Sequence, residues 1–103
     1  MSARQLVSKQ AEIHALCQTY GVARLRLFGS ALGSDWNPDS SDYDFIAEFV
    51  PLAGMNAFHQ YMGFVIDLEK LLGRKVDVVD WSAATNPFFR RNAESHAREI
   101  FAA

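Results

Sequence analysis

The sequence predicts an α/β (α+β) fold in which a small mixed β-sheet of about three to four strands is flanked by helices. Three short segments, 22–28, 43–50 and 75–79, have the apolar patterning of strands. Helical periodicity occupies the stretches before, between and after these segments. With 103 residues, of which 50% are hydrophobic, the chain has the length and apolar content of one domain with a single core. We therefore expect residues 1–103 to form one domain.

The first part of the chain is expected to form one helix followed by a strand. Residues 2–5 have the spacing of a capping box, in which a hydroxyl and an amide side chain satisfy N–H groups at a helix start. Apolar residues then recur on one helical face: Leu6, Ile13, Leu16, Cys17 and Tyr20. Gly21 is suited to end this helix in a left-handed conformation. In 22–28, Arg24 and Arg26 alternate with leucines, which predicts a strand with these arginines on its polar face.

A polar segment, a second strand and a second helix follow. Residues 29–41 are rich in Gly, Ser, Asp, Asn and Pro, which favours a loop or short helical turns. Residues 43–50 are nearly continuous in apolar character, which predicts a strand covered on both faces and ended by Pro51. A helix is expected over about 56–72, with Gly73 as its cap. The spacing of its apolar residues predicts which of them face the core: Phe58, Tyr61, Met62, Val65, Leu68 and Leu72.

A third strand and a third helix complete the expected order. Residues 75–79 predict the strand, and Asn86 with Pro87 suits a helix start, as N-cap and first helical residue. Four residues of this helix are expected to face inward: Phe89, Ala93, Ala97 and Ile100. Glu94 and Arg98 would then lie one turn apart on its outer side. Three aromatic residues are interpreted as packing residues: Tyr43, Phe88 and Phe89.

The composition excludes several classes of protein. Ten basic residues against twelve acidic ones give a net charge of -2, which argues against an extended nucleic-acid surface. The one cysteine excludes an intrachain disulfide and a zinc site built on several cysteines. The sequence contains no export signal, and its longest apolar stretches are far shorter than the ~20 residues that span a bilayer. We therefore expect a cytoplasmic protein with no membrane partner.

Three aspartates carry the main functional signal. Asp42 and Asp44 are two positions apart at the start of a strand, so their carboxylates lie on the same side. Two such carboxylates are costly to desolvate unless a cation neutralises them, and Mg²⁺ prefers oxygen ligands shared with substrate phosphates. If the strand with Asp77 is adjacent, three carboxylates can hold two metal ions ~3.5–4 Å apart. Asp80 is expected to face elsewhere and is not included. The pattern therefore predicts a site for two magnesium ions that consists of Asp42, Asp44 and Asp77.

Gly29 and Ser30, directly after the first strand, supply the complementary half of the predicted site. A glycine lets the backbone approach a phosphate closely, and a helical turn that begins there would point free N–H groups at an anion. The Ser30 hydroxyl adds a further donor. Together with the aspartates, these residues predict a site for a metal-bound nucleoside triphosphate.

These motifs resemble those of a known family. A Gly-Ser after a strand, an Asp-x-Asp about ten residues later and a lone Asp on a following strand look like the nucleotidyltransferase superfamily that includes DNA polymerase beta. The segments 41–49, 71–79 and 86–90 resemble the small bacterial and archaeal minimal nucleotidyltransferases. With the linking helices, the resemblance covers nearly the whole chain from about Leu6 onward.

The resemblance implies a polymerase beta-like fold and an Mg²⁺-dependent transfer of a nucleoside monophosphate, with ATP as the co-substrate. In that family the protein is the antitoxin of a HEPN-domain toxin, and several members transfer AMP to a tyrosine of the toxin. Asp42 and Asp44 would bind both metal ions, and Asp77 would bind the catalytic metal and help to deprotonate the acceptor hydroxyl. Gly29 and Ser30 would hold the departing phosphates.

Two departures from the family pattern leave alternatives open. Eleven residues, one more than is usual in the family, separate Ser30 from Asp42, and Ala31 with Leu32 stands where members often have an arginine. One alternative is a non-catalytic antitoxin that neutralises its partner by occlusion. Another is the nucleotidyl-transfer subunit of a split enzyme that modifies a small molecule. For the transferase, we expect the acceptor to come from outside, because 103 residues leave no second domain to bind a small substrate, which favours a partner protein or an oligomer that completes the site.

Overall fold

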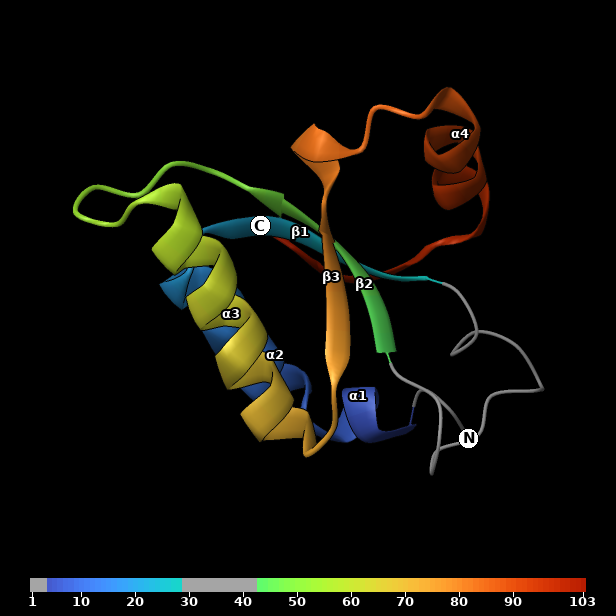
Figure 1. The fold of residues 1–103 in the computed structure, drawn as a ribbon. Helices are drawn as coiled ribbons and strands as arrows, with labels where there is room; N and C mark the ends of the chain where they lie inside the picture. The colour runs from blue at the N-terminus through green and yellow to red at the C-terminus, as the bar shows by residue number, and fades with distance from the viewer. Residues whose placement is uncertain (1–3, 29–42) are drawn as a thin grey trace.

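Four strands form one mixed sheet in the order β3-β2-β1-β4 (Figure 1). The structure is a computed structural model that describes residues 4–28 and 43–103. Its strands are β1 (Val22–Phe28), β2 (Tyr43–Phe49), β3 (Val76–Asp80) and β4 (Arg98–Ala102). β1 pairs antiparallel with β2 and with β4, whereas β3 runs parallel to β2. The three predicted strands and the mixed sheet are therefore confirmed.

The helices are α1 (Arg4–Ser8), α2 (Gln10–Thr19), α3 (Ala57–Leu72), the short 3-10 helix η2 (Trp81–Ala83) and α4 (Pro87–His96). The prediction of one N-terminal helix is corrected, because Lys9 adopts φ −109° and ψ 20° and separates α1 from α2. On either side of this turn, Leu6 and Ile13 both belong to the buried core. Gly21 then adopts φ 68°, the left-handed conformation that was expected after the helix.

One face of the sheet and the helices α2 and α3 enclose the core. The buried cluster joins residues of both helices with alternate residues of β1, β2 and β3: Ile13, Cys17, Leu25, Leu27, Tyr43, Phe45, Phe64, Leu68, Val76 and Val78. Because side chains alternate along a strand, the intervening residues point to the opposite face. We call that second face, which includes Arg26, Asp44 and Asp77, the open face.

Helix α4 lies over part of the open face, and Figure 1 shows it well away from α2 and α3. The rings of Phe28 and Phe89 meet there, with their centroids 5.5 Å apart. Asn86 begins the helix as predicted, since its side chain accepts hydrogen bonds from the N–H groups of Phe88 and Phe89. Phe88, interpreted from the sequence as a packing residue, is instead 77% exposed.

The end of the chain differs from the expected helix. Helix α4 stops at His96, and Ala97 is extended, with φ −71° and ψ 143°. Ile100 and Arg98 therefore lie on β4 rather than on a helix, and Glu94 and Arg98 are not one helical turn apart. Pairing with β1 satisfies backbone groups of an otherwise free edge and buries Phe101 beside Leu25. The apolar spacing at the end of the chain is compatible with a helix and with a strand, and the pairing with β1 stabilises the strand.

The core-facing side of α3 is also partly corrected. Phe58 is 71% exposed, while Gln60 is buried and its Nε2 donates to the carbonyl oxygens of Tyr20 (2.8 Å) and Val50 (2.6 Å). These bonds satisfy two backbone acceptors where β1 begins and β2 ends, which explains a buried polar side chain. Leu68 and Leu72 are buried as expected, and Gly73, with φ 68°, caps the helix. No helix in 4–28 or 43–103 is long and apolar enough to cross a membrane.

Candidate active site

Asp44 and Asp77 are direct neighbours on the open face. The parallel register of β2 and β3 pairs Asp44 with Asp77, on strands that lie about 4.8 Å apart. The residues on either side of each aspartate, Tyr43 with Phe45 and Val76 with Val78, point into the core. Both carboxylates must therefore project from the opposite face. The expected approach of the third strand to the aspartate-bearing strand is thus confirmed for this pair.

The other predicted site residues lie outside the described residues. Asp42 directly precedes Tyr43 in the chain, and Gly29 and Ser30 directly follow Phe28. Phe28 is the register partner of Asp44, so the described part of β1 ends beside this aspartate. The roles of Gly29, Ser30 and Asp42 remain predictions.

The chemistry of the described pair fits a magnesium ion. Carboxylate oxygens are the hard ligands that this ion prefers, and two like charges in register on neighbouring strands repel each other unless a cation lies between them. Asp77 is exposed and Asp44 is only partly buried, so both are open to an ion with its own water ligands. Within 4–28 and 43–103 no group of three His, Cys, Asp or Glu side chains could hold a metal. Asp42, the third ligand predicted from the sequence, lies outside the described residues.

Helix α3 fixes the position of β3. The Tyr61 hydroxyl donates to the Val78 carbonyl oxygen at 2.5 Å, and the Glu69 carboxylate accepts from the Val76 N–H at 3.1 Å. Burial raises the pKa of Tyr61, and the negative charges of Asp77 and Asp80 raise it further. The Tyr61 hydroxyl is therefore held as a neutral donor, which anchors β3 immediately after Asp77.

Asp80 has a structural role of its own. Its carboxylate accepts hydrogen bonds from the N–H (3.0 Å) and the hydroxyl (2.8 Å) of Ser82, and it caps η2. This agrees with the expectation that Asp80 does not join the aspartate cluster.

Tyr43, next to Asp44 in the chain, is fully buried. Burial raises the pKa of its hydroxyl, and the positive charge of Arg74, whose guanidinium lies over the Tyr43 ring, opposes that rise.

Helix α4 contacts both the end of β1 and the segment after β3. The sequence did not indicate this arrangement. Phe89 packs on Phe28 at the end of β1, beside Asp44. Arg90 donates from Nη1 to the carbonyl oxygens of Trp81 (3.0 Å) and Ala84 (2.5 Å), in the segment that follows β3. The helix thus braces the end of β1 against the segment after β3. The sequence indicated the start of α4 at Asn86 and Pro87 and the packing role of Phe89, but not the elements that α4 contacts.

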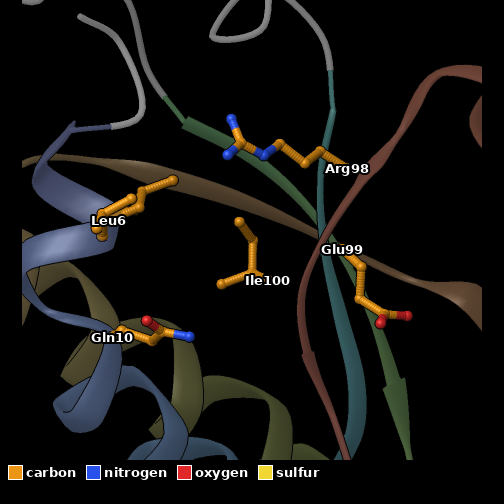
Figure 2. Close-up of a pocket in the computed structure, with 6 residues that line it drawn as sticks. Leu6, Gln10, Arg98, Glu99 and Ile100 are labelled. Atoms are coloured by element: carbon orange, nitrogen blue, oxygen red, sulfur yellow. The ribbon is translucent and has the colours of Figure 1, made fainter.

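A hollow of about 220 Å³ lies elsewhere, at the β4 edge of the sheet. Figure 2 shows Leu6 and Gln10 on one side of it and Arg98, Glu99 and Ile100 on the other. β4 is the edge strand opposite β3, so the strands β2 and β1 separate this hollow from Asp77. It is therefore not part of the aspartate site.

Comparison with known proteins places the chain among nucleotidyl-transferring domains. The family model described as nucleotidyltransferase domain matches residues 12–100. The "Putative protein adenylyltransferase MJ1379" of Methanocaldococcus jannaschii is 30% identical over 91 residues, which are 88% of this chain and 87% of that protein.

Solved structures share the fold. A structure described as a "putative minimal nucleotidyltransferase" is 27% identical, has a TM-score of 0.75 and is matched over 94% of each chain. A tri-AMPylated Shewanella oneidensis HEPN toxin in complex with MNT antitoxin is matched at 16% identity and a TM-score of 0.65. That match covers 95% of this chain and 73% of the other, and at this identity it shows the fold alone.

Proposed function

Because the chain belongs to the nucleotidyltransferase domain family, we propose that it transfers AMP from ATP to a hydroxyl group of a partner protein. The observation that carries this proposal is the direct pairing of Asp44 with Asp77 on the open face. The partner in this proposal is a HEPN toxin, the acceptor is one of its tyrosines, and the chain acts as its antitoxin. Two of the similar proteins support this choice. The Methanocaldococcus jannaschii protein is named a putative protein adenylyltransferase, and the Shewanella oneidensis structure is a complex of an AMPylated toxin with its antitoxin.

Asp42, Asp44 and Asp77 are the proposed magnesium ligands, in a site for two ions. Bound magnesium supplies charge neutralisation to the triphosphate and to the developing charge at phosphorus. Asp77 accepts the proton of the acceptor hydroxyl, whose oxygen forms a bond to the α-phosphorus. The bond from the α-phosphorus to the bridging oxygen breaks, and pyrophosphate leaves. Gly29 and Ser30 are proposed to bind the departing phosphates through backbone N–H groups and the serine hydroxyl.

The tyrosines of the chain itself are poor acceptors, which supports an acceptor on another molecule. The chain contains three tyrosines. Tyr43 is 1% exposed. The Tyr20 hydroxyl donates to Asp67 at 2.5 Å, and the Tyr61 hydroxyl donates to the Val78 carbonyl. None of these hydroxyls can reach a nucleotide on the open face without breaking the packing of α2 and α3. In this proposal residues 1–103 act as one catalytic domain in the cytoplasm.

Transfer of labelled AMP tests the proposed activity. Purified protein, Mg²⁺ and ATP labelled at the α-phosphate are added to lysate of the source organism, and proteins are separated on a denaturing gel. We expect a labelled band with the wild type and none with Asp44→Asn. Asp67→Asn is the matched control, because it makes the same chemical change on α3 and retains an oxygen that can accept from Tyr20. Equal labelling by wild type and Asp44→Asn would overturn the proposal.

Protection of cells from the toxin separates catalysis from occlusion. If AMP transfer neutralises the toxin, cells that express the toxin with Asp44→Asn stop growing, whereas cells with Asp67→Asn survive. Survival with Asp44→Asn, together with a stable complex of the two proteins, would instead show an antitoxin that acts by binding alone. The folding of each variant is checked by its thermal unfolding.

A further inference from the structure

An apolar side chain, that of Val79, is exposed beside the aspartate pair on the open face. Val79 follows Asp77 by two positions on β3, and the residues that alternate with them, Val76 and Val78, belong to the core. Val79 therefore projects from the same face as Asp77, and it is 38% exposed. The Cα atoms of Asp77 and Val79 are about 6–7 Å apart, because a strand rises about 3.3 Å per residue.

The neighbours of Val79 across the sheet are covered. The register pairs Val79 with Ile46 on β2, and it pairs Ile46 with Arg26 on β1. Ile46 is 1% exposed. Arg26 is buried as well, and its guanidinium carbon lies 4.5 Å from the centroid of the Trp81 ring. Of these three residues in one row, Val79 is therefore the one that another molecule can contact on the open face.

The geometry of the transfer leads to the row of Val79, in an argument that rests on the proposed function. The residues proposed to bind the departing phosphates directly follow Phe28, which pairs with Asp44. In phosphoryl transfer the attacking and leaving oxygens lie roughly in line, on opposite sides of phosphorus. The acceptor oxygen must therefore come from the side away from those residues. Val79 lies on that side, because its row crosses β1 at Arg26, two residues before Phe28.

Side chains of α3 partly occupy the outer edge of β3. The Glu69 carboxylate accepts a hydrogen bond from the Val76 N–H (3.1 Å), and the Tyr61 hydroxyl donates to the Val78 carbonyl oxygen (2.5 Å). A segment of the acceptor cannot add to β3 as a further strand without displacing both side chains. The acceptor hydroxyl must therefore approach Asp77 from above the open face, at the end of a side chain.

We propose that Val79 contacts the ring of an acceptor tyrosine and so selects a phenolic hydroxyl over the aliphatic hydroxyl of serine or threonine. A tyrosine carries its hydroxyl at the far end of the ring, so the oxygen can lie at Asp77 while the ring packs on Val79. The hydroxyl of serine or threonine is too close to its own backbone to allow both contacts. In the transfer, the phenolic oxygen forms a bond to the α-phosphorus and its proton passes to Asp77. The bond from the α-phosphorus to the bridging oxygen breaks, and pyrophosphate leaves.

Conservative variants of Val79 test the proposal. Purified protein, Mg²⁺ and ATP labelled at the α-phosphate are combined with a dilution series of lysate of the source organism, which supplies the acceptor. Val79→Thr keeps the shape of the side chain but replaces a methyl group with a hydroxyl. We expect it to raise the apparent KM for the acceptor by about fivefold or more and to leave the KM for ATP within about twofold.

Two further variants are the controls. Val79→Ile keeps an apolar contact, so its apparent KM for the acceptor should stay within about twofold of the wild-type value. Val50→Thr makes the same chemical change at a valine that is 45% exposed and follows the far end of β2 from Asp44. It should leave both KM values unchanged. Thermal unfolding checks that each variant is folded.

Mass spectrometry of the labelled protein identifies the modified residue, which we expect to be a tyrosine. This result needs only the wild type, so it is decisive even if a variant does not fold. AMP on serine or threonine, or an acceptor KM that Val79→Thr leaves unchanged, would overturn the role of Val79 while AMP transfer itself stands. A rise in the KM for ATP alone would place the nucleoside at Val79 and overturn that role equally. Absence of labelling by the wild type would instead overturn the proposed function, and this inference with it.

Discussion

Phe28 and Phe89 pack edge to face, with their ring centroids 5.5 Å apart and their planes at 70°. Phe28 ends β1 beside Asp44 and directly precedes Gly29, while Phe89 belongs to α4. Through this pair, a helix distant in sequence packs on the end of β1, directly before the residues that are proposed to bind phosphates.

Replacement of Phe89 by alanine should affect both stability and nucleotide binding. We expect a loss of about 2 kcal/mol in the free energy of unfolding, since the ring is half-buried. We also expect a higher KM for ATP with a smaller effect on kcat, because the end of β1, which directly precedes the proposed phosphate-binding residues, loses its contact with α4. Phe88→Ala is the matched control, because Phe88 is 77% exposed. Urea unfolding and initial-rate kinetics measure the two effects, and equal behaviour of the two variants would contradict the role of Phe89.

Removal of one carboxylate of the aspartate pair should stabilise the metal-free protein. Asp44 and Asp77 are register partners, and like charges directly opposite each other destabilise a strand pair by about 0.2–1 kcal/mol. We expect Asp77→Asn to raise the thermal unfolding temperature in EDTA and to abolish AMP transfer. Addition of Mg²⁺ should stabilise the wild type and have little effect on the variant. An equal response of both proteins to Mg²⁺ would argue against a metal site at this pair.

Tyr61 should make the stability of the protein fall at alkaline pH. Burial and the charges of Asp77 and Asp80 raise its pKa in the folded state, so the folded protein retains this proton above the pH at which the unfolded chain loses it. The contribution is complete below the unfolded value of about 10 and is lost as the pH rises through the folded value. Tyr61→Phe should flatten the fall in stability above about pH 10. It should also cost about 1 kcal/mol at pH 7, because the Val78 carbonyl loses its donor. Chemical unfolding at a series of pH values measures both effects.

Gly63 should not tolerate the change to alanine that usually strengthens a helix. Alanine is favoured over glycine by about 1 kcal/mol inside a helix, but here a Cβ atom would lie 2.5 Å from Cε1 of Tyr20. We expect Gly63→Ala to lower the free energy of unfolding by about 1–3 kcal/mol. The double variant Tyr20→Ala, Gly63→Ala should be more stable than Tyr20→Ala alone, because the clash is gone and the helix preference remains. If Gly63→Ala alone stabilised the protein in urea unfolding, the close packing of α2 on α3 would be refuted.

The sequence predicts the parts of this fold that depend on local patterns. The alternation in 22–28 and the cap at Asn86 identify elements whose signals lie within a few residues. The adjacency of the Asp77 strand to the Asp44 strand was a condition of the predicted site, and the sheet meets it. The strand character of 98–102 was missed because its apolar spacing also fits a helix. It becomes a strand only through pairing with β1, a segment more than seventy residues away.

Burial on the open face was equally hidden from the sequence. Alternation correctly placed Arg26 opposite the core leucines, but Trp81 and α4 cover it there, so a residue expected on a polar surface is 3% exposed. The cover comes from residues far along the chain, which no local pattern reports. The same applies to Gln60, whose burial follows from two carbonyl oxygens that only the folded chain brings together.

The position of β4 also determines the order in which the sheet can be completed while the chain is synthesised. β1 is an internal strand, yet one of its two neighbours, Arg98–Ala102, is made after the other three strands of the sheet. Until residues 98–102 have left the ribosome, β1 presents a free hydrogen-bonding edge, and Leu25 lacks the cover of Phe101. The nascent chain therefore exposes an edge of β1 during the synthesis of α3, β3 and α4, and the emergence of β4 removes this site for pairing with other chains.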